Sequence, residues 1–145
     1  MPRCKSFSGA GESLTPNVGV YSYPTKKSPN SAGQFEFDVS NFRDPAGQKQ
    51  FSQAPNGLAK EVVEWVRQDR RVPIIVKDCI LLAEDLVRLR PDGRSTCGWL
   101  SFGFKDYHGK WIAPAVAEAV AESLSEAGFN VATHHSCNTV MGDKK

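Results

Sequence analysis

The residues best suited to ligand chemistry surround a polar turn at residues 105–110. An apolar run at residues 99–104 precedes this turn, and an alanine-rich amphipathic segment follows it from Trp111. A strand, a glycine-containing turn and a helix in this order direct backbone N–H groups and the positive end of the helix towards an anion. The pattern predicts an anion-binding site. Its candidate residues are Lys105, His108, Gly109 and Lys110.

Three further candidates for the same site lie at or beyond the ends of other predicted strands. Asp38 comes near the end of an alternating strand at residues 35–39, and Arg43 follows in a proline-containing loop. His135 lies at the end of the last predicted strand. Arg43 could clamp a phosphate with its planar guanidinium group. Structural roles stay open, since Asp38 could cap its own loop and Arg43 could pair with Asp44.

A second group of cations lies near the ends of the two predicted central helices. Its members are Arg67, Arg70, Arg71, Arg88 and Arg90. Positive side chains near a helix C-terminus stabilise the helix through its macrodipole, which is one explanation for their placement. The other is a basic patch that binds RNA phosphates. The sequence leaves both explanations open.

Hydrophobic periodicity predicts the elements that position these residues. Strands are expected at 18–23, 35–39, 99–104 and 129–134, and helices from Leu58 to about Pro73, at 74–89 and at 111–127. The β-branched run at 74–76 leaves a short strand there as an alternative. The order of elements predicts an α/β fold, a single layered domain with a short, largely parallel sheet flanked by helices.

Ligands bind beyond the carboxyl ends of the strands in such sheets. Residues 38–45, 105–110 and 134–135 are therefore expected to converge at one edge. The α/β domain is expected to span residues 18–136, with a disordered leader at 1–17 and a flexible tail at 137–145.

Composition narrows the class of protein. With 145 residues, 40% hydrophobic and 23% charged, the chain is typical of one soluble globular domain. No apolar run approaches the roughly 20 residues that span a membrane, and no secretory signal is recognisable, so a cytoplasmic protein is expected. The 4 cysteines form no C-x-x-C pair, so we expect reduced thiols and neither metal nor cofactor.

Two segments resemble the C-terminal domain of the RapZ family. Residues 37–45 read Phe-Asp-Val-Ser-Asn-Phe-Arg-Asp-Pro, similar to the family's strand that ends in Asp-x-Arg and enters an Asn-Pro or Asp-Pro loop. Residues 117–121, 128–131 and His135 are similar to its Ala-Glu-x-Leu-Ala, Gly-x-x-Val and final His. The chain has no P-loop, so it resembles this module without the ATPase domain that precedes it in the family. The resemblance implies binding of small regulatory RNA and of an amino-sugar phosphate through basic residues.

The chain departs from that family at the ligand loop. The family's Gly-Cys-Thr-Gly-Gly-x-His-Arg-Ser-Val has its His, Arg and Ser replaced by Trp111, Ile112 and Ala113. Two further arginines of the family pattern correspond to Ser40 and Ser136. The resemblance therefore implies a degenerate anion pocket.

These patterns favour a binding module that recognises an anionic ligand, either RNA or a phosphosugar or nucleotide. An enzyme acting on a phosphorylated small molecule and a ligand-free protein-interaction domain remain as alternatives. No catalytic residue is assigned, because no nucleophile lies in the turn and His108 has no evident orienting partner. The oligomeric state stays open.

Overall fold

The computed structural model describes residues 17–25, 34–54, 56–88 and 100–136. The tail predicted at 137–145, Arg90 and the side chain of Arg88 lie outside this part of the chain, as does the predicted leader except its last residue. That residue, Asn17, opens the first strand.

Within these ranges the chain forms a four-stranded parallel sheet and three α-helices, and the predicted α/β class is confirmed. The strands are β1 (Asn17–Pro24), β2 (Phe35–Asp38), β3 (Leu100–Asp106) and β4 (Asn130–His135), in the order β2-β3-β1-β4. The helices are α1 (Lys60–Arg67), α2 (Arg71–Arg88) and α3 (Ile112–Glu126), and a 3-10 helix covers Lys49–Phe51.

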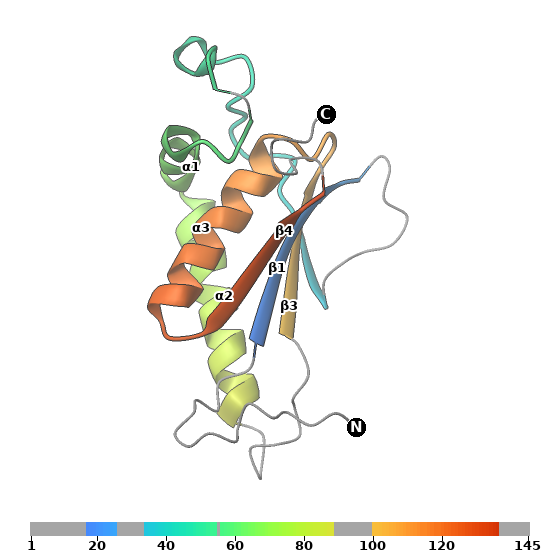
Figure 1. Cartoon of the computed structure of the whole chain (residues 1–145), viewed down its shortest axis with the longest axis vertical. Coiled ribbons are helices and arrows are strands. Elements are labelled where there is room, and N and C mark those ends of the chain that lie inside the picture. The colour runs from blue at the N-terminus through green and yellow to red at the C-terminus, as the bar shows by residue number, and fades with distance from the viewer. Residues whose placement is uncertain (1–16, 26–33, 55, 89–99, 137–145) are drawn as a thin grey trace.

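The helices form two layers on one side of the sheet (Figure 1). Helix α3 packs directly on β1, β3 and β4, while α1 and α2 pack on the other side of α3. As a middle layer, α3 is buried on nearly all sides, which explains its apolar sequence. Its alanines, among them Ala113 and Ala117, let the sheet and the outer helices approach it closely.

Strand alternation separates the two faces of the sheet. Val18 and Val20 of β1 and Phe102 and Phe104 of β3 are fully buried towards α3. Residues between them in sequence, such as Tyr21, lie on the opposite face. The core thus continues from the sheet through α3 to the buried residues of α1 and α2. The carboxyl ends of all four strands point the same way.

The central helices differ from their prediction at the junction. Pro73 was expected to end or follow the first helix, but α1 already ends at Arg67 and Pro73 lies in the first turn of α2. Proline is tolerated there because N–H groups of a first turn have no partner within the helix. The alternative strand at 74–76 is not adopted, since these residues lie within α2.

Candidate functional site

The start of α3 holds a carboxylate of the chain itself. Asp106, the last residue of β3, is only 5% exposed. Its Oδ1 accepts the Gly109 N–H at 2.5 Å, and its Oδ2 accepts the Ala113 N–H at 2.6 Å. A carboxylate at this position caps the helix and interacts favourably with the positive end of its dipole. The sequence predicts a bound anion at this helix start, and the carboxylate of Asp106 takes that place in the structure.

The turn is also closed by tight packing. Gly109 has φ +72°, and a Cβ on it would lie 2.5 Å from the Pro24 nitrogen, so only glycine fits. On another side, the Gly57 N–H donates to the Lys110 carbonyl at 3.0 Å. A Cβ on Gly57 would lie 2.1 Å from the Trp111 carbonyl oxygen. Two distant segments thus press their backbones against the turn.

The other predicted residues of this site are dispersed. Lys105 pairs with Glu36 at 3.3 Å, while His108 and Lys110 are exposed on the turn. Asp38 accepts the Ser40 N–H at 2.9 Å and the Ser40 hydroxyl, and these hydrogen bonds lower the pKa of its carboxyl. Its loop-capping alternative is thus the arrangement observed.

The expected convergence of Asp38 with His135 is not observed. Asp38 ends β2 and His135 ends β4, and the order β2-β3-β1-β4 puts these strands at opposite edges of the sheet. Their side chains also lie on opposite faces, because the register pairs Asp38 with Lys105 and His135 with Ser22. One ligand of small size does not reach both.

His135 instead belongs to a hydrogen-bonded chain that the sequence analysis missed. Its Nδ1 lies 2.7 Å from the Ser22 hydroxyl, and its Nε2 lies 2.7 Å from Oε2 of Glu118 on α3. These three residue types are those of a Ser-His-Glu catalytic triad, in which the serine faces the substrate and the acid is buried. Here the serine is the buried member: Ser22 is 1% exposed and the Glu118 side chain is 29% exposed. A substrate therefore does not reach the hydroxyl, and the chain ties β1, β4 and α3 together.

Arg43 and Arg71 come together at the junction of α1 and α2. The Arg43 guanidinium carbon lies 4.1 Å from the ring centroid of Trp65, and that of Arg71 lies 4.2 Å from that of Phe42. Both side chains are exposed, as is the neighbouring Arg70. We call Arg43, Arg70 and Arg71 the arginine surface.

Asp69 holds this surface in place from beneath. Its Oδ1 accepts the Arg71 backbone N–H and Nε–H, both at 2.9 Å. Its Oδ2 accepts Arg71 Nη2 at 2.8 Å and the Arg43 N–H at 3.3 Å. These bonds, above all those from the Arg71 guanidinium, hold the pKa of the Asp69 carboxyl well below its usual range. They also raise the pKa of Arg71.

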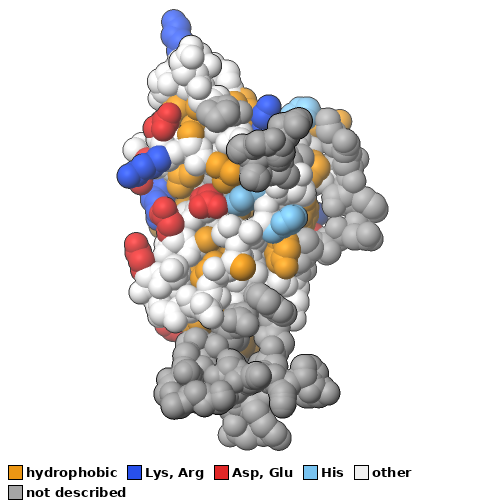
Figure 2. Space-filling model, in the orientation of Figure 1, with side chains coloured by type: hydrophobic (Ala, Val, Ile, Leu, Met, Phe, Trp, Pro, Cys, Tyr) orange, Lys and Arg blue, Asp and Glu red, His pale blue; other side chains and the backbone are white. Residues whose placement is uncertain are grey.

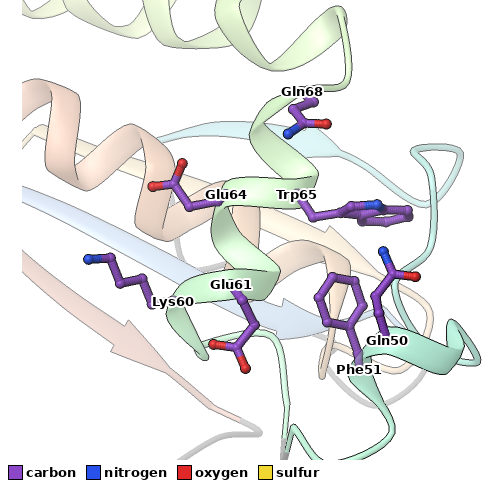
Figure 3. A pocket seen from close by; sticks show the side chains of 7 residues that line it. All are labelled: Gln50, Phe51, Lys60, Glu61, Glu64, Trp65 and Gln68. Carbon is purple, nitrogen blue, oxygen red and sulfur yellow. The ribbon is translucent and has the colours of Figure 1, made fainter.

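A shallow hollow of about 480 Å³ lies next to the arginine surface (Figure 3). Trp65, the ring over which Arg43 lies, is one of its lining residues. The rings of Phe51 and Trp65 meet edge to face at 5.4 Å, and Gln50 extends towards Trp65. The remaining lining residues are Lys60, Glu61, Glu64 and Gln68. Two carboxylates against one ammonium do not favour a phosphate inside the hollow. Its aromatic wall and amides suit a flat uncharged ring.

Other predicted cations and thiols have structural surroundings. Arg67 forms an ion pair with Glu122 of α3, in a region where Figure 2 shows side chains of both signs over α1 and α3. Burial raises the pKa of the Cys79 thiol to about 12, so this thiol stays protonated. Among the described residues, no group of three His, Cys, Asp or Glu side chains is placed to hold a metal ion. No helix in the described ranges has both the length and the apolar character needed to cross a membrane.

Neither a scan against protein-family models nor a search of curated proteins finds a match to this chain.

Proposed function

We propose that this domain is a binding module for single-stranded RNA, with the arginine surface contacting phosphates and the hollow beside Trp65 receiving a base. The observation that carries the proposal is the stacking of Arg43 on Trp65 and of Arg71 on Phe42. A guanidinium held over a ring is fixed in position, and its planar set of N–H donors can bind a phosphate.

The surroundings of Trp65 suit RNA because they combine the two contacts that single strands use. Phosphates need cations, which Arg43 and Arg70 present to solvent. Unpaired bases stack on aromatic rings, and Phe51 and Trp65 form the aromatic wall of the adjacent hollow. The resemblance to the RapZ C-terminal domain points to the same class of partner.

The charge at the start of α3 argues against a phosphosugar or nucleotide bound there. The Asp106 carboxylate accepts two of the N–H groups that a phosphate would need, and its charge would repel one. An enzymatic function is less well supported, because Ser22 is inaccessible and the Cys79 thiol is protonated.

The test is fluorescence anisotropy with a labelled single-stranded RNA of about twelve nucleotides at about 50 mM salt. For about three phosphate contacts, the slope of log affinity against log salt should be near −2, at about −0.7 per contact. The double variant Arg43→Ala/Arg70→Ala should bind about tenfold more weakly or worse.

Lys110→Ala provides the matched comparison, since it also removes an exposed cation but at the start of α3. Its affinity should stay near that of the unmodified protein. If Lys110→Ala weakens binding and the double arginine variant does not, the site is at α3 and our assignment is wrong. An affinity that ignores salt would contradict RNA binding through phosphates altogether.

A further inference from the structure

Helix α2 exposes an apolar stripe on its outer side. Ile74 is 59% exposed and Leu81 is 46% exposed, and they are seven residues apart on one face of the helix. A mostly apolar groove of about 450 Å³ runs beside this stripe. Its lining residues are Arg67, Val72, Pro73, Val76, Lys77, Ile80 and Leu81. A face of this kind on a helix is typical of a contact surface.

The charges around the stripe identify the partner. The amino-terminal part of the face carries Arg71 and Lys77, with Arg70 directly before the helix, and the carboxyl-terminal part carries Asp78, Glu84 and Asp85, all of them exposed. An antiparallel second copy of α2, centred between Lys77 and Asp78, matches every one of these residues with its opposite. The pairs are Lys77 with Asp78, Ile74 with Leu81, Arg71 with Glu84 and Arg70 with Asp85.

The same register also respects burial. It matches inward residues with inward ones, as with Val72 and Ala83, which are both fully buried in the domain. It also places each exposed Ile74 opposite the exposed Leu81 of the other copy, on either side of the central charge pairs. We infer that α2 is a self-complementary surface through which two copies of this chain associate as an antiparallel, two-fold symmetric dimer.

The size of the surface sets the expected strength. Two helices crossing along one stripe bury less than the roughly 1,200 Å² of a standard interface. The dimer should therefore be reversible, with a dissociation constant on the order of ten micromolar or weaker. Because charge pairs lie at the centre and at both ends of the contact, association should weaken at high salt. This inference goes beyond RNA binding, although both surfaces include Arg70 and Arg71.

The test is sedimentation equilibrium without RNA, from about 5 to about 500 µM protein at low and at high salt. We expect a monomer–dimer equilibrium that shifts towards monomer at high salt. Lys77→Asp places two carboxylates from each copy at the centre, and Asp78→Lys places two ammonium groups there. Each variant alone should remain monomeric, and an equal mixture of the two should form a heterodimer.

The double exchange Lys77→Asp/Asp78→Lys is the matched control, because it restores opposite charges across the two-fold axis and should dimerise like the unmodified chain. All substituted side chains are exposed, and circular dichroism checks that each variant folds. A protein that stays monomeric over the whole range would overturn the inference and show that another occupant, if any, covers this face. Self-association that the two single variants do not change would place the dimer contact elsewhere.

Discussion

Helices α2 and α3 begin in similar ways and yet leave different surfaces. At each start an aspartate outside the helix accepts backbone N–H groups: Asp69 those of Arg43 and Arg71, and Asp106 those of Gly109 and Ala113. Asp106 is enclosed by a glycine turn that packs on Pro24. Asp69 also binds the exposed guanidinium group of Arg71.

The two helix starts differ in whether an anion from solvent can bind beside them. Both carboxylates complement the positive end of a helix, so neither helix start is an open site for a phosphate. At α3, the described hydrogen bonds of the Asp106 carboxylate come from backbone N–H groups. At α2 it fixes a cation whose outer edge faces solvent. An aspartate at the helix start therefore occupies the anion position at α3, whereas at α2 it fixes the position of an exposed arginine.

The largest effect is expected for Asp106→Ala. It removes the acceptor of two backbone N–H groups in a buried turn, at a cost of about 3 kcal/mol in the free energy of unfolding. Asp69→Ala should cost less, about 2 kcal/mol, because the Arg71 side chain it releases can be hydrated. Urea unfolding monitored by circular dichroism measures both. An equal or larger loss for Asp69→Ala would contradict the distinction between an enclosed and a surface cap.

Gly109→Ala tests the enclosure of the α3 turn directly. The new Cβ would meet the Pro24 nitrogen at 2.5 Å in a backbone conformation of positive φ, and we expect a loss of about 2–3 kcal/mol. Gly47→Ala is the control, since Gly47 also has positive φ (+90°) but no atom within 4 Å of a Cβ. It should lose only about 1 kcal/mol. Similar losses for the two variants would mean that packing at Gly109 contributes little.

Acid should destabilise the α2 start. The pKa of Asp69 in the folded protein lies below its ordinary value of 3.8, because Arg71 and backbone N–H groups bind the ionised form. Its contribution to stability is therefore complete above the unfolded pKa and is lost as pH falls below about 4. Melting temperatures measured from pH 6 to about pH 3 should fall less steeply for Asp69→Asn than for the unmodified chain. A steeper fall in the variant would reverse the sign and exclude this explanation.

The smallest effect is expected for Arg43→Ala. It removes an exposed cation–π contact with Trp65 and should cost about 0.5–1 kcal/mol of stability. Arg43→Lys should cost less, since an ammonium group keeps part of the attraction to the ring. Thermal melts measure both changes. A loss of stability greater than that of Asp69→Ala would show that Arg43 has a larger structural role than one exposed contact with Trp65 explains.

The fold was largely predictable because its main elements have strong local patterns. Alternating valines and phenylalanines define β1 and β3, and the alanine-rich period defines α3. The junction of α1 and α2 was not predicted, because Pro73 is an equally good residue for ending a helix and for starting one. The cap that decides between them, Asp69, acts through hydrogen bonds to a following residue and to a distant loop.

The candidate site was predictable only in part. The strand–turn–helix pattern located the helix start, and the signal for its occupant was Asp106 itself, an acid preceding Gly109 by three residues. The separation of Asp38 from His135 follows from the strand order, which the sequence of elements does not determine. The meeting of Arg43 with Arg71 is likewise a tertiary contact between a loop and a helix.

The alanines of α3 have a consequence for how this chain can change. Their methyl groups set the thickness of the domain, because α3 has the sheet on one side and the outer helices on the other. A larger side chain at Ala117, which is fully buried, would not fit without compensating changes in the residues around it. Divergence along this helix therefore requires coordinated substitutions in the layers that pack on it.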